Sequence, residues 1–179
     1  MAADAVGLLD VLGLAGAHVV VLSPGGAIGQ TMAIEHPGRV RSLTSMMSTT
    51  GDLAVGRPEP EALAALAGPQ PTGRQEVVER MVRAVRVFGS PGFESDEAAV
   101  ADRAGRSYDP PGVARQAVAS LASGDRTELL RSLAVPTLVI DGAADAMCDP
   151  SGGRAAAAAV PGAELVVFDG VGHDLPRAL

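Results

Sequence analysis

Three residues of the types that form a nucleophilic triad stand at turns that follow apolar runs. They are Ser23 in Val-Leu-Ser-Pro-Gly-Gly, Asp145 in Asp-Gly-Ala-Ala-Asp and His173 in Gly-Val-Gly-His-Asp. A serine nucleophile needs a base to accept its proton, and that base needs an acid to fix its tautomer. Ligands of open parallel sheets bind beyond the carboxyl ends of the strands. If each residue follows such a strand, the three side chains converge on one site.

Each of the three residues also has a purely structural interpretation. Serine caps helices, aspartate is common in turns, and a histidine between glycines can belong to an ordinary loop. Weaker candidates for the acid are Asp52, Asp141 and Asp149. We expect structural roles for His18, His36 and Cys148.

The elements that must position these residues follow from the apolar pattern. Short apolar runs predict strands over residues 17–22, 39–47, 135–141 and 164–168. The valine-rich run 17–22 is typical of a strand buried on both faces. Helical spacing predicts helices over residues 3–14, 25–36, 61–66, 74–87, 95–106, 111–122 and 151–159. This alternation predicts an α/β fold, with a mostly parallel open sheet, right-handed crossovers and a helical insertion.

The chain resembles the C-terminal part of an α/β-hydrolase, most of all small bacterial esterases of the aclacinomycin-methylesterase-like kind. Four motifs carry this resemblance. They are His-Val-Val-Val-Leu-Ser-Pro-Gly-Gly from His18, Ile-Glu-His-Pro-Gly-Arg-Val-Arg-Ser-Leu from Ile34, Val-Pro-Thr-Leu-Val-Ile-Asp-Gly-Ala-Ala-Asp from Val135 and Gly-Val-Gly-His from Gly170. The order serine, aspartate, histidine along the chain is that of the family. By this resemblance Ser23 is the nucleophile, Asp145 the acid and His173 the base.

The resemblance also implies a domain organisation and an activity. Residues 1–57 would form the part of the core that bears the nucleophile. Residues 58–130 would form a helical cap insertion, and residues 131–179 the part of the core with the acid and the histidine. The implied activity is serine-dependent hydrolysis of a carboxylic ester or a related acyl substrate. It requires no cofactor and no metal.

Two residues beside Ser23 depart from the family pattern. The family usually has glycine at the position of Val21, so we expect the side chain to crowd the turn. The residue after the nucleophile normally donates its N–H to the oxyanion hole, and Pro24 has no N–H. Losing one such donor costs about 10²–10³ in kcat. The Gly25 N–H is an alternative donor.

A third departure is that no strand or glycine-rich loop of the family precedes the helix at 3–14. We therefore expect strand 17–22 to form an apolar sheet edge, which invites pairing with another chain. The rival interpretations follow from these departures. One is a non-catalytic pseudoenzyme that binds a small ligand or a partner. The other is a fragment that completes a sheet supplied by another polypeptide.

Composition narrows the set of partners. A net charge of −7 over 179 residues argues against nucleic acid and against anionic membranes, which both require clustered basic residues. A single cysteine excludes an intramolecular disulfide. No apolar run reaches the length of about 18 residues that predicts a membrane span, and the acidic N-terminus is unlike a signal peptide. We expect a cytoplasmic protein that acts on a small ester-like substrate. We also expect the chain to form a homo-oligomer through its exposed sheet edge.

Overall fold

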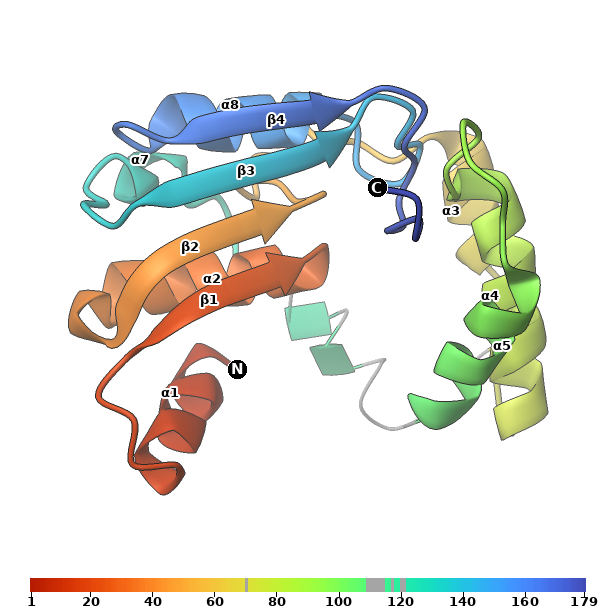
Figure 1. Cartoon of the computed structure of the whole chain (residues 1–179), viewed down its shortest axis with the longest axis horizontal. Coiled ribbons are helices and arrows are strands. Elements are labelled where there is room, and N and C mark those ends of the chain that lie inside the picture. Colours follow the sequence, from red (N-terminus) through yellow and green to blue (C-terminus); the bar gives the residue numbers. More distant parts are fainter. Residues whose placement is uncertain (70, 109–114, 117, 120–121) are drawn as a thin grey trace.

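The computed structural model describes residues 1–69, 71–108, 115–116, 118–119 and 122–179, and its strands form one sheet (Figure 1). The four strands lie in the order β1-β2-β3-β4, and every neighbouring pair is parallel. Their bounds are Ala17–Leu22 for β1, Val40–Met46 for β2, Thr137–Gly142 for β3 and Glu164–Phe168 for β4. The predicted mostly parallel open sheet is confirmed.

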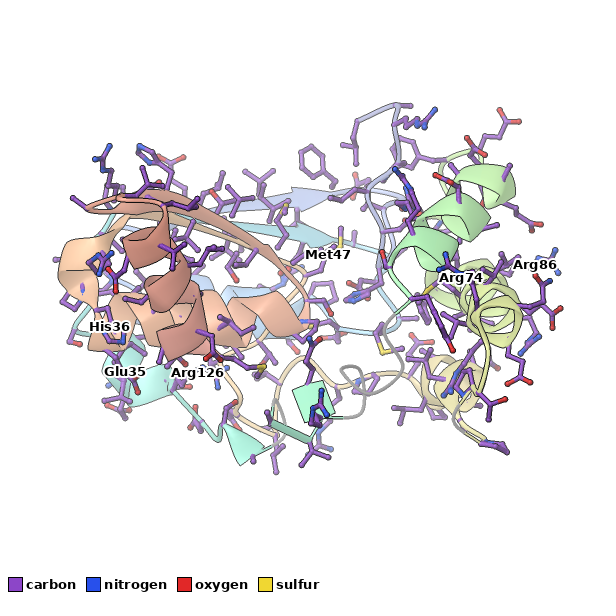
Figure 2. The ribbon with its side chains drawn as sticks, turned by 90° about the horizontal axis from the view of Figure 1, so that it is seen from below. Glu35, His36, Met47, Arg74, Arg86 and Arg126 are labelled. Carbon is purple, nitrogen blue, oxygen red and sulfur yellow. The ribbon has the colours of Figure 1, made fainter. Side chains whose placement is uncertain are left out.

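The helices that connect the strands lie on one face of this sheet. Helix α2 (Pro24–Glu35) joins β1 to β2, α7 (Thr127–Leu130) precedes β3, and α8 (Ser151–Ala159) joins β3 to β4. Because the strands are added in one direction, right-handed crossovers place every connecting helix on the same side. Figure 2 shows α2 and α1 (Ala2–Val11) together beneath the sheet. The main core forms between these layers, from residues that include Met32, Ala33, Leu43 and Leu130.

The opposite face of the sheet exposes apolar side chains. Val20 is 65% exposed, and Leu22, Val166 and Phe168 are each between 37% and 38% exposed. We call these four residues the open face. Exposure alternates along β1, so the prediction of a strand buried on both faces was wrong for residues 17–22. The physical reason is that no helix in the described part of the chain covers this side, and β1 is an edge strand.

Three further helices lie beyond the carboxyl ends of the strands (Figure 1). They are α3 (Pro60–Leu66), α4 (Arg74–Phe88) and α5 (Glu97–Arg106), and α4 packs against both of the others. Their small buried cluster consists of Ala62, Ala84 and Phe88. The helix predicted for 111–122 lies largely outside the described residues. The short helices η1 (Pro37–Arg39) and α7 were not predicted.

No helix in the described ranges combines the length and the apolar character that crossing a membrane requires. The cytoplasmic location inferred from the sequence stays a prediction.

The layer between the sheet and α8 contains a buried carboxyl group, that of Asp141 in β3. The residue is 1% exposed, and neither of its carboxyl oxygens has a hydrogen-bond partner. It packs against Gly153 in the first turn of α8, where the carboxyl group leaves no room for a Cβ atom. Burial, and to a smaller degree the negative charge of Asp145, raises the pKa of Asp141 to about 7.

This carboxyl group makes the free energy of unfolding depend on pH. Between pH 4 and the folded-state pKa near 7, the folded chain binds more of the Asp141 proton than the unfolded chain does, so this contribution to stability declines as the pH rises. Asp141→Asn removes the titration. Its stability relative to the unaltered chain should therefore grow by about 1.4 kcal/mol per pH unit between pH 5 and 6, and by less between pH 6 and 7, where Asp141 begins to ionise in the folded chain. Urea unfolding at pH 5, 6 and 7 measures the difference.

The control for this experiment is Asp169→Asn, which changes an exposed aspartate after β4. It should leave the pH dependence of the unfolding free energy as it is. A constant difference between Asp141→Asn and the unaltered chain across the three pH values would show that Asp141 is ionised in the folded state.

Candidate active site

The structure brings the three candidate residues of the triad together. His173 Nδ1 lies 2.7 Å from Asp145 Oδ2, and His173 Nε2 lies 2.8 Å from Ser23 Oγ. A carboxylate only accepts hydrogen bonds, so Nδ1 carries the ring proton and donates it to Asp145. Nε2 is then free to accept the hydroxyl hydrogen of Ser23. This tautomer is the one that a general base requires.

Ser23 occupies a strained turn between β1 and α2. Its backbone has φ 53° and ψ −120°, a conformation that a residue with a side chain rarely adopts. Two backbone hydrogen bonds hold it, from Ser23 N to Met46 O at 2.9 Å and from Gly26 N to Ser23 O at 2.8 Å. A nucleophile elbow is strained in this way because the turn lifts the hydroxyl above the sheet.

Glycines in α2 make room for Val21. A Cβ atom at Gly29 would lie 3.0 Å from Val21 Cγ2 and 3.0 Å from Leu43 Cδ1, and one at Gly25 would lie 3.4 Å from Val21 Cβ. The side chain that was expected to crowd the turn therefore packs between the sheet and two glycines. Val21 is thus accommodated beside the strained turn at Ser23.

Asp145 is held rigidly in place. Its side chain is 0% exposed, and Oδ1 accepts hydrogen bonds from the Met147 and Cys148 backbone N–H groups, both at 2.8 Å. Oδ2 is left for His173. The other acid candidates have other partners: Asp52 lines the cavity beside Ser23 but accepts from Ala54 N, Asp149 accepts from Ser151 N, and Asp141 is buried beneath α8.

The loop that carries His173 is positioned by the end of α4, which sequence reasoning missed. The His173 N–H donates to Phe88 O at 2.7 Å, and the Phe88 ring meets the imidazole edge-on at 5.9 Å between ring centres. Ser90 Oγ accepts from Gly172 N at 2.9 Å and donates to the Asp174 carboxylate. No sequence motif marked Phe88 or Ser90. Their only signal is that an aromatic residue and a small polar residue follow the helix predicted over 74–87.

An oxyanion formed at Ser23 needs backbone N–H groups nearby that are free to donate a hydrogen bond to it. Pro24 is the first residue of α2 and has no N–H. Gly25 is the second residue of the helix, where the N–H has no partner inside the helix. The Gly25 N–H is therefore the nearest backbone donor beyond the nucleophile in the sequence.

A cavity of about 360 Å³ opens beside the triad. Ser23 and His173 line it together with Met47, Cys148 and Arg126. Burial raises the pKa of the Cys148 thiol to about 12, so at neutral pH it is an uncharged wall residue. Among the described residues, no group of three or more His, Cys, Asp or Glu side chains is arranged to hold a metal ion.

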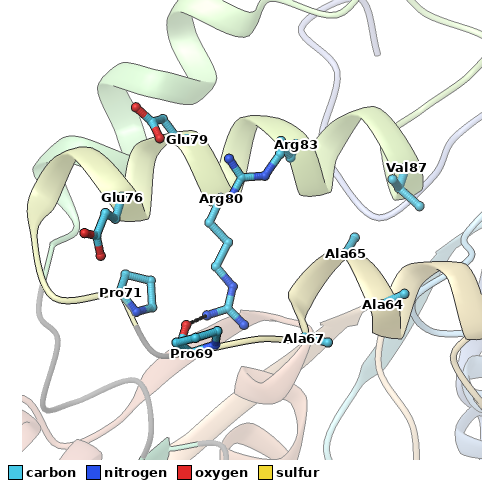
Figure 3. Close-up of a pocket in the computed structure, with 10 residues that line it drawn as sticks. All are labelled: Ala64, Ala65, Ala67, Pro69, Pro71, Glu76, Glu79, Arg80, Arg83 and Val87. Carbon is cyan, nitrogen blue, oxygen red and sulfur yellow. Dashed lines mark hydrogen bonds between the residues drawn. The ribbon is translucent and has the colours of Figure 1, made fainter.

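A larger hollow of about 550 Å³ lies between α3 and α4 (Figure 3). Its lining includes Ala64, Ala65, Arg80 and Arg83, with Arg80 Nη1 3.5 Å from Pro69 O. None of the three candidate residues lines it. The remaining histidines also lie apart from the triad, since His18 Nδ1 is 2.8 Å from Ser42 Oγ across β1 and β2, and His36 ends α2.

Comparison with known proteins gives one consistent family. The sequence profile of the α/β hydrolase fold matches residues 1–176. Rhodomycin D methylesterase of a Streptomyces species is 31% identical over 206 aligned positions, which cover 100% of this chain and 68% of that protein. A 2-hydroxymuconate semialdehyde hydrolase of Pseudomonas putida is 30% identical over 183 positions, covering 94% of this chain and 60% of that protein.

Solved structures agree with the sequence matches. Est816, an N-acyl homoserine lactone degrading enzyme, superposes with a TM-score of 0.72 at 29% identity, covering 96% of this chain and 66% of that one. The chain thus spans between 60% and 68% of the length of these relatives. The profile match over almost its whole length, together with the parallel sheet, shows that the chain belongs to the α/β-hydrolase fold family.

Proposed function

We propose that the chain is a serine hydrolase of carboxylic esters in which Ser23, His173 and Asp145 form the catalytic triad. The observation that carries this proposal is the continuous chain of hydrogen bonds from Asp145 through His173 to Ser23, at 2.7 and 2.8 Å. The named relatives that the chain resembles are a methylesterase and a semialdehyde hydrolase, which supports hydrolysis as the reaction class.

In the proposed mechanism each residue has one role. Ser23 Oγ attacks the acyl carbon while His173 Nε2 takes the hydroxyl proton, and Asp145 stabilises the imidazolium that forms. His173 then gives this proton to the departing alcohol. Water, deprotonated by His173, attacks the acyl-enzyme. The bond from the acyl carbon to Ser23 Oγ then breaks, His173 returns the proton to Oγ, and the acid is released. The Gly25 N–H is the backbone donor available to the developing oxyanion.

We also propose that residues 58–130 act as a cap over the site, and that residues 1–57 and 131–179 form the catalytic core. Support comes from α3, α4 and α5, which pack on one another beyond the carboxyl ends of the strands (Figure 1). The end of α4 contacts His173 through Phe88, so movement of this segment would act directly on the base. Within the range, α7 instead packs on α8 and α2.

The nucleophile is tested by labelling with a fluorophosphonate, which forms a covalent adduct only with an activated serine. Intact-mass analysis of the chain should show a single adduct, and Ser23→Ala should show none. Ser48 lines the same cavity without contacting His173, so Ser48→Ala is the matched control and should still be labelled. A folded chain that takes no label, or a label that persists in Ser23→Ala, would contradict the proposed mechanism.

A non-catalytic binding protein is the second candidate function, and Pro24 is the observation that favours it. An oxyanion hole with one donor missing loses about 10²–10³ in kcat, which is about 3–4 kcal/mol of transition-state stabilisation. A protein that binds a ligand without turning it over could keep the geometry of the triad and lack this donor. The structure around Ser23 and Pro24 fits that description.

Restoring the missing donor distinguishes these two functions. Pro24→Ala supplies an N–H at the first position of α2, where it has no helical partner. If the chain is an esterase limited by its oxyanion hole, kcat for p-nitrophenyl acetate should rise by about 10². Pro60→Ala, which makes the same change at the start of α3, should leave kcat as it is. A measurable kcat that Pro24→Ala leaves unchanged would mean that another donor serves the esterase. The absence of turnover in both chains would support the binding protein.

The exposed edge strand β1 is the surface through which two copies of the chain could associate. The outer edge of β1 is unpaired within the described sheet, and Val20 and Leu22 lie exposed beside it. Edge strands of this kind pair with other chains unless charge prevents it. We propose that two copies associate along β1 and bury these side chains.

Sedimentation velocity tests this association. The unaltered chain should sediment as a dimer in the range from about micromolar to millimolar, in which unpaired strand edges associate, and Val20→Lys should shift it to the monomer. Leu63→Lys adds the same charge at an exposed leucine of α3 and should leave the dimer intact. Monomers of the unaltered chain throughout the concentration range would rule the association out.

A further inference from the structure

The cavity beside the triad contains a buried cation. Arg126, directly before α7, is 5% exposed. Its guanidinium donates from Nε to Gln30 Oε1 at 3.0 Å and from Nη2 to Thr49 O at 3.3 Å. Nη1 donates to Ser123 Oγ and to Gly124 O, both at 2.8 Å. All four acceptors are neutral.

No carboxylate in the described part of the chain forms an ion pair with this cation. The ion pairs of the described residues involve other side chains, and the neighbouring Asp125 is exposed and accepts from the backbone and hydroxyl of Thr127. Burial lowers the pKa of Arg126, and the negative charge of Asp125 offsets this only in part, although a guanidinium stays charged in proteins. A buried charge is costly unless an opposite charge or hydrogen bonds compensate it. The compensation for Arg126 is therefore incomplete without a further anion.

Arg126 has a donor left for such an anion. A guanidinium carries five N–H hydrogens, and the four hydrogen bonds of Arg126 leave one hydrogen on Nη2 unused. The residue lines the same cavity as Ser23 and His173. The other charged residues of the lining are Arg57, whose Nε donates to Leu53 O, and Asp52, which accepts from Ala54 N. The wall thus carries two cations and one anion in a chain whose net charge is −7.

We propose that Arg126 binds a carboxylate of the substrate, so that the pocket selects esters that carry a second, anionic group, such as monoesters of dicarboxylic acids. The ester end lies at Ser23 and the carboxylate end at Nη2 of Arg126. Hydrolysis adds one water across the ester bond and releases an alcohol and a dicarboxylate. This inference rests on the proposed esterase function for the reaction, but the anion preference itself does not depend on turnover.

Arg126 also ties Gln30 of α2 to Thr49 after β2, so a structural role must be separated from recognition. A structural defect would weaken binding of neutral and anionic ligands alike. Loss of an anion contact would weaken only the anionic one. The ratio of the two affinities therefore reports recognition and is insensitive to a general loosening of the site.

The experiment measures binding in the Ser23→Ala background, in which turnover is not required. Isothermal titration calorimetry compares monomethyl adipate, which carries one carboxylate, with the neutral dimethyl adipate. A charge-assisted hydrogen bond predicts that the monoester binds about 10-fold to 100-fold more tightly. Adding Arg126→Met should reduce this ratio to about 1. Arg86→Met, which changes a surface arginine paired with Glu97, should leave it intact.

Two results would overturn the proposed anion site. One is equal affinity for monomethyl adipate and dimethyl adipate in the Ser23→Ala chain, and the other is an affinity ratio that Arg126→Met leaves unchanged. If circular dichroism shows that Arg126→Met is unfolded, Arg126→Lys takes its place, because a lysine lacks the planar fork of donors. It should lower the ratio several-fold without weakening the diester. An anion preference in a chain whose Ser23 takes no fluorophosphonate would refute the hydrolase function and keep the anion site.

Discussion

Parallel pairing of the strands is the constraint on which the candidate site depends. β1, β3 and β4 point the same way, so the residues that follow them meet at one end of the sheet although they are far apart in the sequence. Ser23 follows β1, Asp145 follows β3 and His173 follows β4, and the distances of 2.7 and 2.8 Å close the chain between them. The same connectivity places α2, α7 and α8 on one face and leaves the open face uncovered. The site and the exposed apolar surface thus have one origin.

The sheet was largely predictable from the sequence because β1, β3 and β4 are short, mostly apolar runs beside glycine or proline. Strands 17–22 and 164–168 have the predicted bounds. The burial of residues 17–22 was not predictable from composition, since a valine-rich run reads the same in a central strand and in an edge strand. Its burial depends on what lies on either side, which is a property of the whole sheet. The four-residue α7 was missed because so short a helix leaves no periodic pattern.

The site was predictable to the extent that its residues sit in motifs. Ser23, Asp145 and His173 stand in turns with glycine neighbours, and these turns could be placed at strand ends. The residues that position them carry no such marks. Phe88 and Ser90 act through a backbone carbonyl and a hydroxyl at the end of α4, and Arg126 reaches Gln30 over 96 positions of sequence. Contacts of this kind follow from how α4, α2 and the residues before α7 pack in three dimensions, which the sequence pattern does not specify.

The two departures beside Ser23 have different physical consequences. Val21 is a steric change, and a steric change can be compensated by neighbours: Gly25 and Gly29 leave the space that its side chain fills. Pro24 is the loss of a donor, and no repacking can return an N–H to that position. The fold therefore accommodates both residues equally well, since proline suits the first turn of a helix, while the chemistry is affected by only one of them. In the proposed mechanism, the strained turn and the hydrogen bond to His173 activate Ser23 as the nucleophile. The stabilisation that the oxyanion hole gives to the transition state is independent of the activation of Ser23. In the proposed mechanism both contribute to kcat.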